Sequence, residues 1–424
     1  MSWTNVRDNE LKERARLVIP GGMYGHESTR LLPVEFPQFY SKGKGARLWD
    51  ADGNQYIDHL CAYGPNLLGY GFEPVEAAAE AQLRLGDTLN GPTETMVTLA
   101  ETFVKQITHA DWAMFCKNGS DATSMAMVTA RAYKGRKTIL CARGAYHGAS
   151  PWNTPRPAGI LPEDRAHIAY FEYNDADSLT AAFQAHAGDV AGVFATPFRH
   201  EVFYDQFEPD AEYAALARRL CDEHEALLIV DDVRAGFRLA RDCSWEPLGV
   251  RPDLSTWGKC FANGYPISAL LGSEKARAAA KEIFVTGSFW FQAMPMAAAI
   301  ETLKHIRESD YLERTQDYGR RLREGLTQQA AMHGFGLRQT GPVVMPQILF
   351  EDDPDFRIGY GWTTECLKRG VYFHPYHNGF VTAAHGEAEL RETLTAADEA
   401  FEALKSVSPS LEPHAGLMQL LGAH

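Results

Sequence analysis

The chain has 424 residues, a formal net charge of −14 and a hydrophobic content of 45%. At roughly 100 to 200 residues per domain, this length predicts two or three compact units, and the ordinary hydrophobic content argues against a disordered protein. The acidic charge and the lack of a dense run of lysine and arginine argue against nucleic acid as a partner.

Seven cysteines are spread along the sequence without a CxxC pair or a cluster of metal ligands. Their odd number favours reduced thiols, so we expect a cytoplasmic protein without a bound metal. The charged N-terminus lacks the apolar stretch of a signal peptide, and no later stretch reaches the ~18 apolar residues of a membrane-spanning helix. We therefore expect no membrane partner.

The N-terminal part of the sequence predicts helices and one hairpin. A surface helix is expected over residues 5–18, because the breaker residues Ile19-Pro-Gly-Gly22 end it. A hairpin is expected over residues 45–58, with its turn at Asp52-Gly53-Asn54. Two further helices follow over residues 74–85 and 94–107.

From residue 112 onwards, short apolar runs alternate with helical segments. This alternation predicts a mostly parallel sheet with helices on both faces. Residues 311–405 mix helices with short strands, which is typical of a smaller terminal domain. The expected strands are 112–116, 138–141, 191–195 and 226–230, and the expected helices run to about Tyr133 and over 211–225 and 293–309.

One lysine and one aspartate suggest the chemistry. Lys259 follows Gly258 at the end of a short apolar run, and Asp231 ends another apolar run. An apolar pocket favours the neutral amine that forms a Schiff base, and an aspartate at a strand end can keep a pyridine nitrogen protonated. The pair suggests a pyridoxal phosphate (PLP) enzyme, although a lone lysine after a strand is more often an ordinary surface residue.

Two turns are expected where open α/β sheets bind ligands, at the carboxyl ends of strands. Gly119 and Ser120 open a helix whose free N–H groups and hydroxyl suit a phosphate, but a simple helix cap explains these residues equally well. Tyr146 and His147 lie in a glycine-flanked turn, where the tyrosine could stack on a cofactor ring or belong to an ordinary loop.

Together these segments resemble the class III aminotransferases, which are fold type I PLP enzymes, and in particular the glutamate-1-semialdehyde 2,1-aminomutase-like branch. Residues 228–238 follow the family's L-I-x-D-E-V-x-x-G-F-R pattern, and residues 252–259 follow P-D-L-x-x-x-G-K. The resemblance implies an α/β fold in which a large domain, residues 61–310, carries a mostly parallel seven-stranded sheet. Residues 1–60 and 311–424 would form a smaller α+β domain.

The resemblance also implies roles around the ring of pyridoxal 5'-phosphate. Lys259 would carry the Schiff base and shuttle the substrate proton, and Asp231 would pair with the pyridinium nitrogen. Tyr146 and Val233 would lie on opposite faces of the ring.

The cofactor phosphate would be held by two segments. Gly119 and Ser120 match the family's phosphate turn, whereas Gly287 and Ser288 would contact the phosphate bound to the neighbouring subunit. The resemblance therefore implies a homodimer with shared active sites. His147 and Asp232 would support the residues that contact the cofactor.

Two segments depart from the aminomutase pattern. Residues 370–380 are shorter and lack the glutamate that the aminomutases carry after G-V-Y-x-x-P, which argues against a mutase. Phe289-Trp-Phe291 replaces small residues and would line the substrate channel with aromatic side chains. A bulky or apolar substrate would follow from the second departure.

Candidate substrate residues come from three parts of the chain. Arg30 is the best candidate to bind a carboxylate, because guanidinium groups bind carboxylates bidentately, but its position suits a solvated loop arginine equally well. Tyr63 precedes Gly64, where the relatives have an aromatic residue near the substrate. Three histidines could also line the pocket and suit an acidic group, His26, His374 and His377.

We therefore expect a PLP-dependent aminotransferase that moves an amino group between an amine or amino acid and a keto acid or aldehyde. The substrate would bear a carboxylate, or bulky or aromatic groups. The same first steps leave open an aminomutase, an epimerase or a lyase that never releases a pyridoxamine form. A third possibility, a non-catalytic sugar- or nucleotide-binding protein, would make Lys259 and Asp231 incidental.

Overall fold

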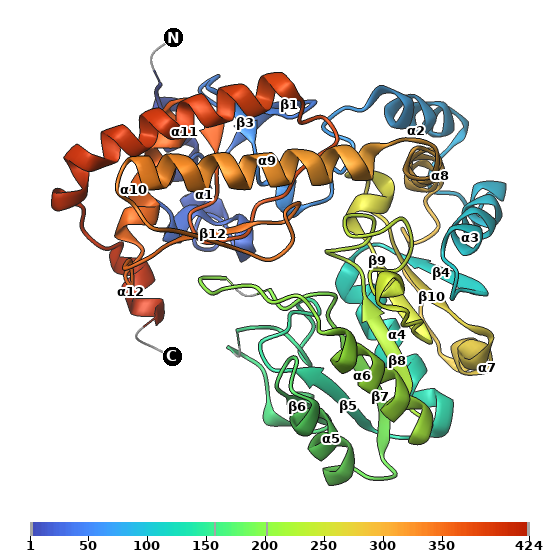
Figure 1. The fold of residues 1–424 in the computed structure, drawn as a ribbon. Coiled ribbons are helices and arrows are strands. Elements are labelled where there is room, and N and C mark those ends of the chain that lie inside the picture. Colours follow the sequence, from blue (N-terminus) through green and yellow to red (C-terminus); the bar gives the residue numbers. More distant parts are fainter. Residues whose placement is uncertain (1–2, 157, 201, 422–424) are drawn as a thin grey trace.

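The computed structural model describes residues 3–156, 158–200 and 202–421, and a seven-stranded sheet forms its centre (Figure 1). The order is β4-β10-β9-β8-β7-β5-β6, and only β10 runs antiparallel to its neighbours. The predicted mostly parallel seven-stranded sheet is therefore confirmed. Its strands are β4 (Trp112–Cys116), β5 (Thr138–Ala142), β6 (Ile168–Phe171), β7 (Val190–Ala195), β8 (Leu227–Asp231), β9 (Leu254–Trp257) and β10 (Ser268–Gly272).

Helices cover both faces of this sheet, as the alternation of strands and helices predicted. One face packs against α4 (Gly119–Lys134) and α7 (Glu274–Glu282). The other face packs against five helices, α2 (Glu73–Leu85), α3 (Glu94–Gln106), α5 (Ala176–Ala185), α6 (Ala211–Glu223) and α8 (Ala293–Glu308). Strand β8 shows the alternation, since Leu228 and Val230 join the second layer while Leu227 and Ile229 join the first.

A smaller sheet joins the two ends of the chain. Its order is β1-β2-β3-β13, and β13 (Val371–Tyr372) pairs in parallel with β3. In Figure 1 the blue N-terminal and red C-terminal segments lie together on this side of the molecule. The remaining strands are β1 (Tyr40–Lys44), β2 (Arg47–Asp50), β3 (Gln55–Asp58), β11 (Leu337–Thr340) and β12 (Gln347–Phe350).

Five helices accompany the smaller sheets: α1 (Val6–Val18), α9 (Tyr311–Met332), α10 (Arg357–Lys368), α11 (Glu387–Val407) and α12 (Ala415–Leu421). Helices α9, α10 and α11 pack into one core with the segment that follows β13. The proposed domain division, with residues 61–310 between two terminal parts, stays a prediction.

Most predicted elements are present, with small shifts of their ends. The hairpin at 45–58 is formed by β2 and β3, and the predicted helices at 5–18, 74–85, 94–107, 211–225 and 293–309 are present. The predicted turn before the helix that runs to Tyr133 is shorter than expected, because α4 already begins at Gly119. Strand β6 and helix α5 were not predicted, since the four residues of β6 are too few to show a periodicity.

All seven cysteines are free and buried. In the part of the chain that the structure describes, no helix is both long enough and apolar enough to cross a membrane.

Candidate active site

The carboxylate of Asp231 lies at the end of β8 and is buried among three hydrogen-bond donors. The Nδ1 atom of His147 lies 2.7 Å from one carboxylate oxygen, and the Thr256 hydroxyl donates to the other at 2.8 Å. The backbone N–H of Val233 also donates to that second oxygen, at 3.2 Å. Thr256 is placed by the parallel pairing of β8 with β9, in which it lies opposite Asp231. Both oxygens are thus held in a fixed orientation.

His147 has one nitrogen committed to this contact. Because a carboxylate can only accept, Nδ1 carries the proton and donates it to Asp231. The other ring nitrogen, Nε2, is buried and has no hydrogen-bond partner among the described residues. The ring lies near Trp152 and Phe194, which hold its plane.

Lys259 lies directly after β9, at the first position of a short 3-10 helix, and adopts a left-handed backbone conformation with φ of +49°. Its Nζ atom donates a 2.6 Å hydrogen bond to the backbone oxygen of Tyr63. Burial, followed by the positive charge of Arg234, lowers the pKa of this lysine to about 7. A large share of the amine is therefore neutral near physiological pH, which is the form that can act as a nucleophile.

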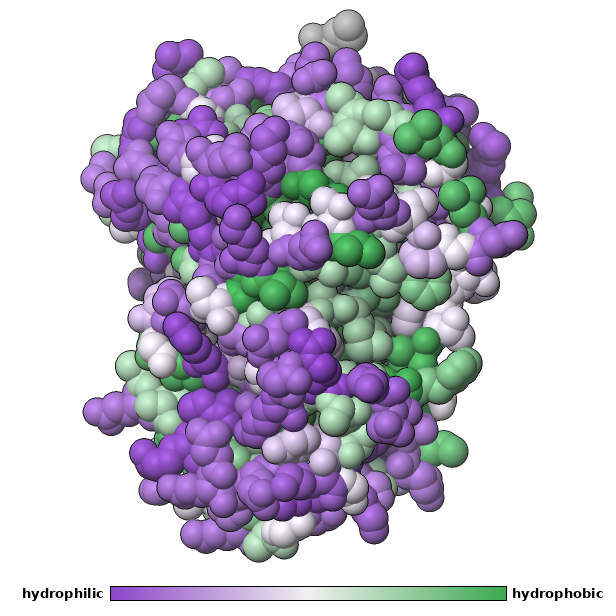
Figure 2. All heavy atoms as spheres, turned by 90° about the vertical axis from the view of Figure 1, so that its right-hand side faces the viewer, coloured by the Kyte–Doolittle hydropathy of each residue, from purple (hydrophilic) through white to green (hydrophobic). Residues whose placement is uncertain are grey.

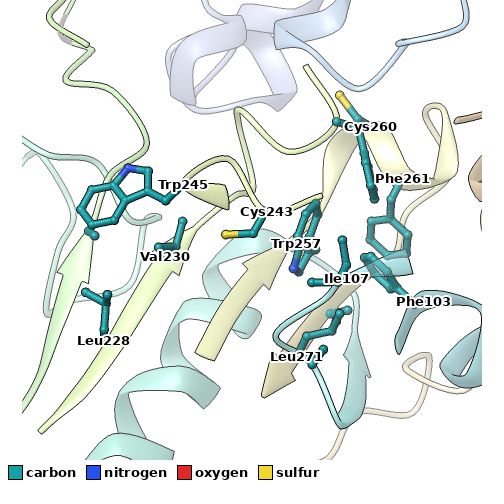
Figure 3. Close-up of a cluster of buried hydrophobic side chains, with 14 of the residues drawn as sticks. Phe103, Ile107, Leu228, Val230, Cys243, Trp245, Trp257, Cys260, Phe261 and Leu271 are labelled. Atoms are coloured by element: carbon teal, nitrogen blue, oxygen red, sulfur yellow. The ribbon is translucent and has the colours of Figure 1, made fainter. Parts of the chain in front are cut away.

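A rigid aromatic core fixes the chain on either side of Lys259. Figure 3 shows Trp257 and Phe261 next to Phe103 from α3, with Ile107 beneath them. The ring of Phe103 lies 5.3 Å from that of Trp257 and 5.0 Å from that of Phe261. Because aromatic pairs at these separations add to the free energy of burial, the backbone of Lys259 is anchored two residues before and two residues after it.

A strained loop presents the carbonyl that Lys259 contacts. Cys61, Ala62 and Tyr63 all have positive φ angles, and Gly64 follows with φ of +106°. Each such non-glycine residue costs of order 1–3 kcal/mol and persists only where its surroundings impose it. The surroundings here include the Arg238 guanidinium, which donates to the Gly64 oxygen at 2.7 Å.

The first turn of α4 offers a phosphate-binding surface. Asn118 and Asp121 cap the helix reciprocally, which leaves the N–H groups of Gly119 and Ser120 without a hydrogen-bond partner among the described residues. A Cβ atom at Gly119 would come within 2.7 Å of Val233, so glycine is required there. Free N–H groups at a helix N-terminus bind anions.

Tyr146 and Val233 lie near these groups. Tyr146 is partly exposed, and burial raises the pKa of its hydroxyl while the charges of Arg234 and Asp231 also act on it. A Cβ atom at Gly258 would come within 3.4 Å of Val233, so the valine packs against the glycines on both sides of the site.

Four of the predicted substrate residues form one cluster beside Lys259. The ring of Tyr63 lies 4.5 Å from that of His26, 5.1 Å from that of His377 and 6.2 Å from that of His374. Burial lowers the pKa of His374 to about 3 and that of His377 well below its usual range. Burial therefore disfavours the charged form of both imidazoles, and the expectation that these histidines suit an acidic group stays a prediction.

The other predicted residues lie further from this centre. Arg30 is exposed. Its positive charge opposes the rise in the pKa of Tyr376 that burial causes. Ser288 is exposed and Gly287 lies under the Trp290 ring. Asp232 is buried and accepts a hydrogen bond from the Ser244 N–H at 3.0 Å.

Two residues of the site were not predicted from the sequence, Arg234 and Thr256. Both stand at positions that the family patterns leave open, so the patterns gave them no role. The only signal for Thr256 is its place on a strand that ends beside Asp231. The sequence contains no local signal for Arg234, because its burial depends on the distant segment around Asn378. The Nη1 atom of Arg234 donates a hydrogen bond to the Asn378 side-chain oxygen at 2.7 Å.

Comparisons with known proteins agree with this geometry. Residues 32–385 match the profile of the family Aminotransferase class-III. An aminopentol aminotransferase from Sphingopyxis macrogoltabida is 68% identical over 418 residues, which cover 99% of each chain. A glutamate-1-semialdehyde 2,1-aminomutase from Nitrosospira multiformis is 30% identical, over 93% of this chain and 99% of the relative.

A solved structure is equally similar. The FumI protein of Sphingopyxis sp. MTA144, described as a PLP internal aldimine form, superposes with a TM-score of 0.96 at 67% identity. The match covers 97% of this chain and 99% of that chain.

The residues present fit PLP. The buried Asp231 carboxylate suits a protonated ring nitrogen, the unpaired N–H groups of Gly119 and Ser120 suit a phosphate, and the neutral amine of Lys259 suits a Schiff base. The glycines at 119 and 258 keep the space between these groups free of side chains. The chain belongs to the class III aminotransferases and is a PLP-dependent enzyme of fold type I.

Proposed function

We propose that this enzyme transfers the amino group of a long-chain, hydroxylated primary amine to a keto acid. The observation that carries the transfer chemistry is the buried Lys259 amine, whose pKa is lowered to about 7, beside the fixed carboxylate of Asp231. The substrate class is supported by the relative that is 68% identical and is named for an aminopentol, an amino alcohol with five hydroxyl groups.

The side chains around Lys259 suit such an amine. Tyr63, His374 and His377 are uncharged at neutral pH, and neutral imidazole and phenol groups both donate and accept hydrogen bonds, as hydroxyl groups do. Phe289 and Phe291 are exposed beside Ser288 and offer apolar surface for a carbon chain at the neighbouring subunit's site. A polyol on a long chain needs both kinds of surface.

Each residue would then have a defined task. When bound, PLP supplies an electron sink for the substrate carbon that bears the amino group. Lys259 Nζ removes the proton from that carbon and returns it, as a general base and acid. Asp231 holds the positive charge of the ring nitrogen, while His147 and Thr256 keep its carboxylate oriented. Gly119 and Ser120 would hold the phosphate through their N–H groups, and Tyr146 would cover the ring.

We favour transfer between two molecules over a mutase reaction. The aminomutase relatives are about as distant as the 3-aminobutyryl-CoA aminotransferase of Cloacimonas acidaminovorans, at 30% and 33% identity. Residues 370–380 hold no acid, and His374 and His377 lie there beside Lys259 instead. The resemblance to the aminomutase-like branch therefore stays a prediction and does not decide the activity.

We also propose a homodimer in which Gly287 and Ser288 reach the cofactor phosphate of the partner. The exposed apolar residues Leu83, Leu85, Leu89, Val97, Phe284, Phe289 and Phe291 support it. Hydrogen bonds from the backbone and side chains of residues 292–294 to Asp87 bring the apolar residues of 83–97 next to those of 284–291. Figure 2 shows hydrophobic surface on the face that carries α2, α3 and α8 in Figure 1. Exposed apolar areas of this kind mark interfaces.

A cytoplasmic location is part of the same proposal. Seven free, buried thiols suit a reducing compartment, because disulfides form and persist in oxidising ones. Fractionation of the native organism would test this location.

The test is the donor half-reaction without a keto acid. Enzyme loaded with PLP is mixed with an amino polyol, an unsubstituted alkylamine of the same length, an α-amino acid, or the polyol without its amino group. We expect the visible cofactor band to disappear fastest with the amino polyol and to persist with the polyol alone. Lys259→Ala should abolish this change. Product formation while the band persists would instead favour a mutase, epimerase or lyase.

A further inference from the structure

Arg234 places a guanidinium group beside the reactive lysine. It follows β8 by three residues, and burial lowers its pKa to about 10. Its positive charge is the second largest influence on the pKa of Lys259, after burial. The charges of Tyr146 and Asp231 act on Arg234 in turn. The Arg234 guanidinium is therefore close enough to Lys259 and Asp231 for their charges to interact.

This cation forms no ion pair with an acidic side chain in the part of the chain that the structure describes. Among the described residues, its hydrogen-bond partners are the Asn378 side-chain oxygen at 2.7 Å from Nη1 and the His377 Nε2 at 3.5 Å from the same atom. The hydrogens on Nε and Nη2 have no partner in the described part of the chain. Asp231, the acid that influences it, is already committed to His147 and Thr256. A partly buried charge without a counter-ion is costly, so the arrangement is complete only with an anion.

A buried imidazole, His200, favours the same ligand. Burial lowers the pKa of His200 well below its usual range, and the charges of Arg234 and Lys259 lower it further. Both ring nitrogens of His200 are buried without a hydrogen-bond partner among the described residues. His377 cannot donate to the same ligand, because its Nδ1 donates to the Asn378 backbone oxygen at 2.9 Å and its Nε2 faces the Arg234 guanidinium. A neutral imidazole can donate one hydrogen bond to an anion without adding charge.

The location separates this anion from the cofactor phosphate. The side chain of Arg234 is held by the 377–380 segment, where Phe380 also lies 5.9 Å from the guanidinium. That segment adjoins Tyr63 and the Lys259 amine. The phosphate is assigned to the first turn of α4, where the N–H groups of Gly119 and Ser120 have no hydrogen-bond partner among the described residues. A planar guanidinium whose Nε and Nη2 hydrogens are free presents one edge that matches the geometry of a carboxylate.

We propose that Arg234, assisted by His200, binds the carboxylate of the 2-oxo acid that accepts the amino group. The assignment rests on the proposed function, because a hydroxylated amine donor carries no carboxylate and leaves the site to the acceptor. Arg234 would make the enzyme select 2-oxo acids over aldehydes. Arg30, the carboxylate candidate from the sequence, is exposed and lacks this position.

The test separates the acceptors by charge. Enzyme in its pyridoxamine form is mixed with pyruvate or with propanal, and the return of the visible band is followed in a single turnover. In Arg234→Met we expect the pyruvate concentration for half-maximal rate to rise about 100-fold, as loss of hydrogen bonds to a charged group predicts. Loss of the Arg234 charge also raises the pKa of Lys259 and should slow the propanal and amine half-reactions. The loss with pyruvate should exceed the loss with propanal by about 10-fold or more, because only pyruvate carries a carboxylate. Arg234→Lys should give a partial loss, since it keeps the charge without the fork.

Several results would overturn the assignment. One is equal loss with pyruvate and propanal. Another is an unchanged pyruvate concentration for half-maximal rate in Arg234→Met. A third is a pyruvate-selective loss in Arg30→Met but not in Arg234→Met. Folding is checked by circular dichroism, and Arg234→Met should fold because it removes an unpaired buried charge.

A binding measurement keeps this assignment independent of the proposed function. Pyruvate is titrated calorimetrically into the PLP-loaded enzyme, which cannot aminate it. Binding that is lost in Arg234→Met supports the carboxylate site even if no amine in the donor panel reacts. Pyruvate binding of equal strength in wild type and Arg234→Met overturns the site even if the donor half-reaction succeeds.

Discussion

The Nζ atom of Lys259 donates a hydrogen bond of 2.6 Å to the backbone oxygen of Tyr63. This contact uses one hydrogen of the amine and orients its lone pair, which the neutral form needs for attack. The oxygen belongs to a run of left-handed residues, so its direction is imposed by strain in the loop. The same loop therefore positions the lysine and, through the Tyr63 ring, one wall of the substrate pocket.

The buried amine predicts a stability that depends on pH. Because the pKa of Lys259 is about 7 in the folded protein and about 10.4 when unfolded, the unfolded chain binds the extra proton between these values. The free energy of unfolding of the cofactor-free protein should therefore rise with pH, by up to ~1.4 kcal/mol per pH unit over this window. Lys259→Met should remove that rise.

The measurement is urea unfolding of cofactor-free wild type and Lys259→Met at one protein concentration. At pH 6 the variant should be more stable by up to roughly 4 kcal/mol, and the difference should close towards pH 10. Lys105→Met, on the exposed side of α3, controls for the loss of a surface lysine. A difference that is constant over the whole pH range would contradict a lowered pKa.

The adjacent acids Asp231 and Asp232 should differ sharply in importance. Asp231→Asn replaces the charge opposite the ring nitrogen and should lower kcat by about 10²–10³-fold, as removal of electrostatic catalytic groups commonly does. Asp232→Asn is its matched control, because Asp232 is also buried at this strand end but bonds to the Ser244 N–H. Steady-state kinetics should show a loss only in the first variant. A fully active Asp231→Asn would place the ring elsewhere.

The sequence predicted the ends of strands better than the contacts between distant segments. Asp231, Lys259 and Gly119 were found because each stands where an apolar run stops, and parallel strands bring such ends together. The sequence did not predict that Arg234 is buried, or that His374 and His377 are neutral. Those properties depend on packing between residues 231–238 and 374–380, which are far apart in the chain. Local patterns contain no information about such burial.

Arg30 shows how little local reasoning says about burial. The sequence favoured it as a carboxylate ligand because of its residue type, although its stretch is longer than that of the aminomutases, and this role stays a prediction. The structure exposes its side chain and leaves its carboxylate role unsupported. Residue type alone could not separate Arg30 from Arg234, because the difference between them is the desolvation that tertiary packing creates.

Thr256 should act as a positioning residue for Asp231. Thr256→Val keeps the shape of the side chain but removes the 2.8 Å hydrogen bond to the carboxylate. Since hydrogen bonds to charged groups contribute about 1.5–3 kcal/mol, affinity for PLP should fall roughly 10- to 100-fold. The pH at which the cofactor band changes should also move, because the oriented carboxylate tunes the ring nitrogen. Thr256→Ser keeps the hydroxyl and should restore both properties, which a purely structural role for the threonine would not explain.

A shared active site predicts that two inactive variants complement each other. Lys259→Ala removes the reactive amine of a subunit, and Ser288→Asp places a negative charge where its partner's phosphate would bind. Each homodimer should be inactive. In a mixed dimer, one of the two sites combines an intact Lys259 with an intact Ser288 from the other subunit. After mixing equal amounts under conditions that exchange subunits, about a quarter of all sites should be intact. Activity is measured against the fraction of mixed dimers, which a tag on one variant allows to be isolated. Mixed dimers that form but remain inactive would show that residues 287–288 serve no site across the interface, whereas recovered activity requires them to serve the partner's cofactor.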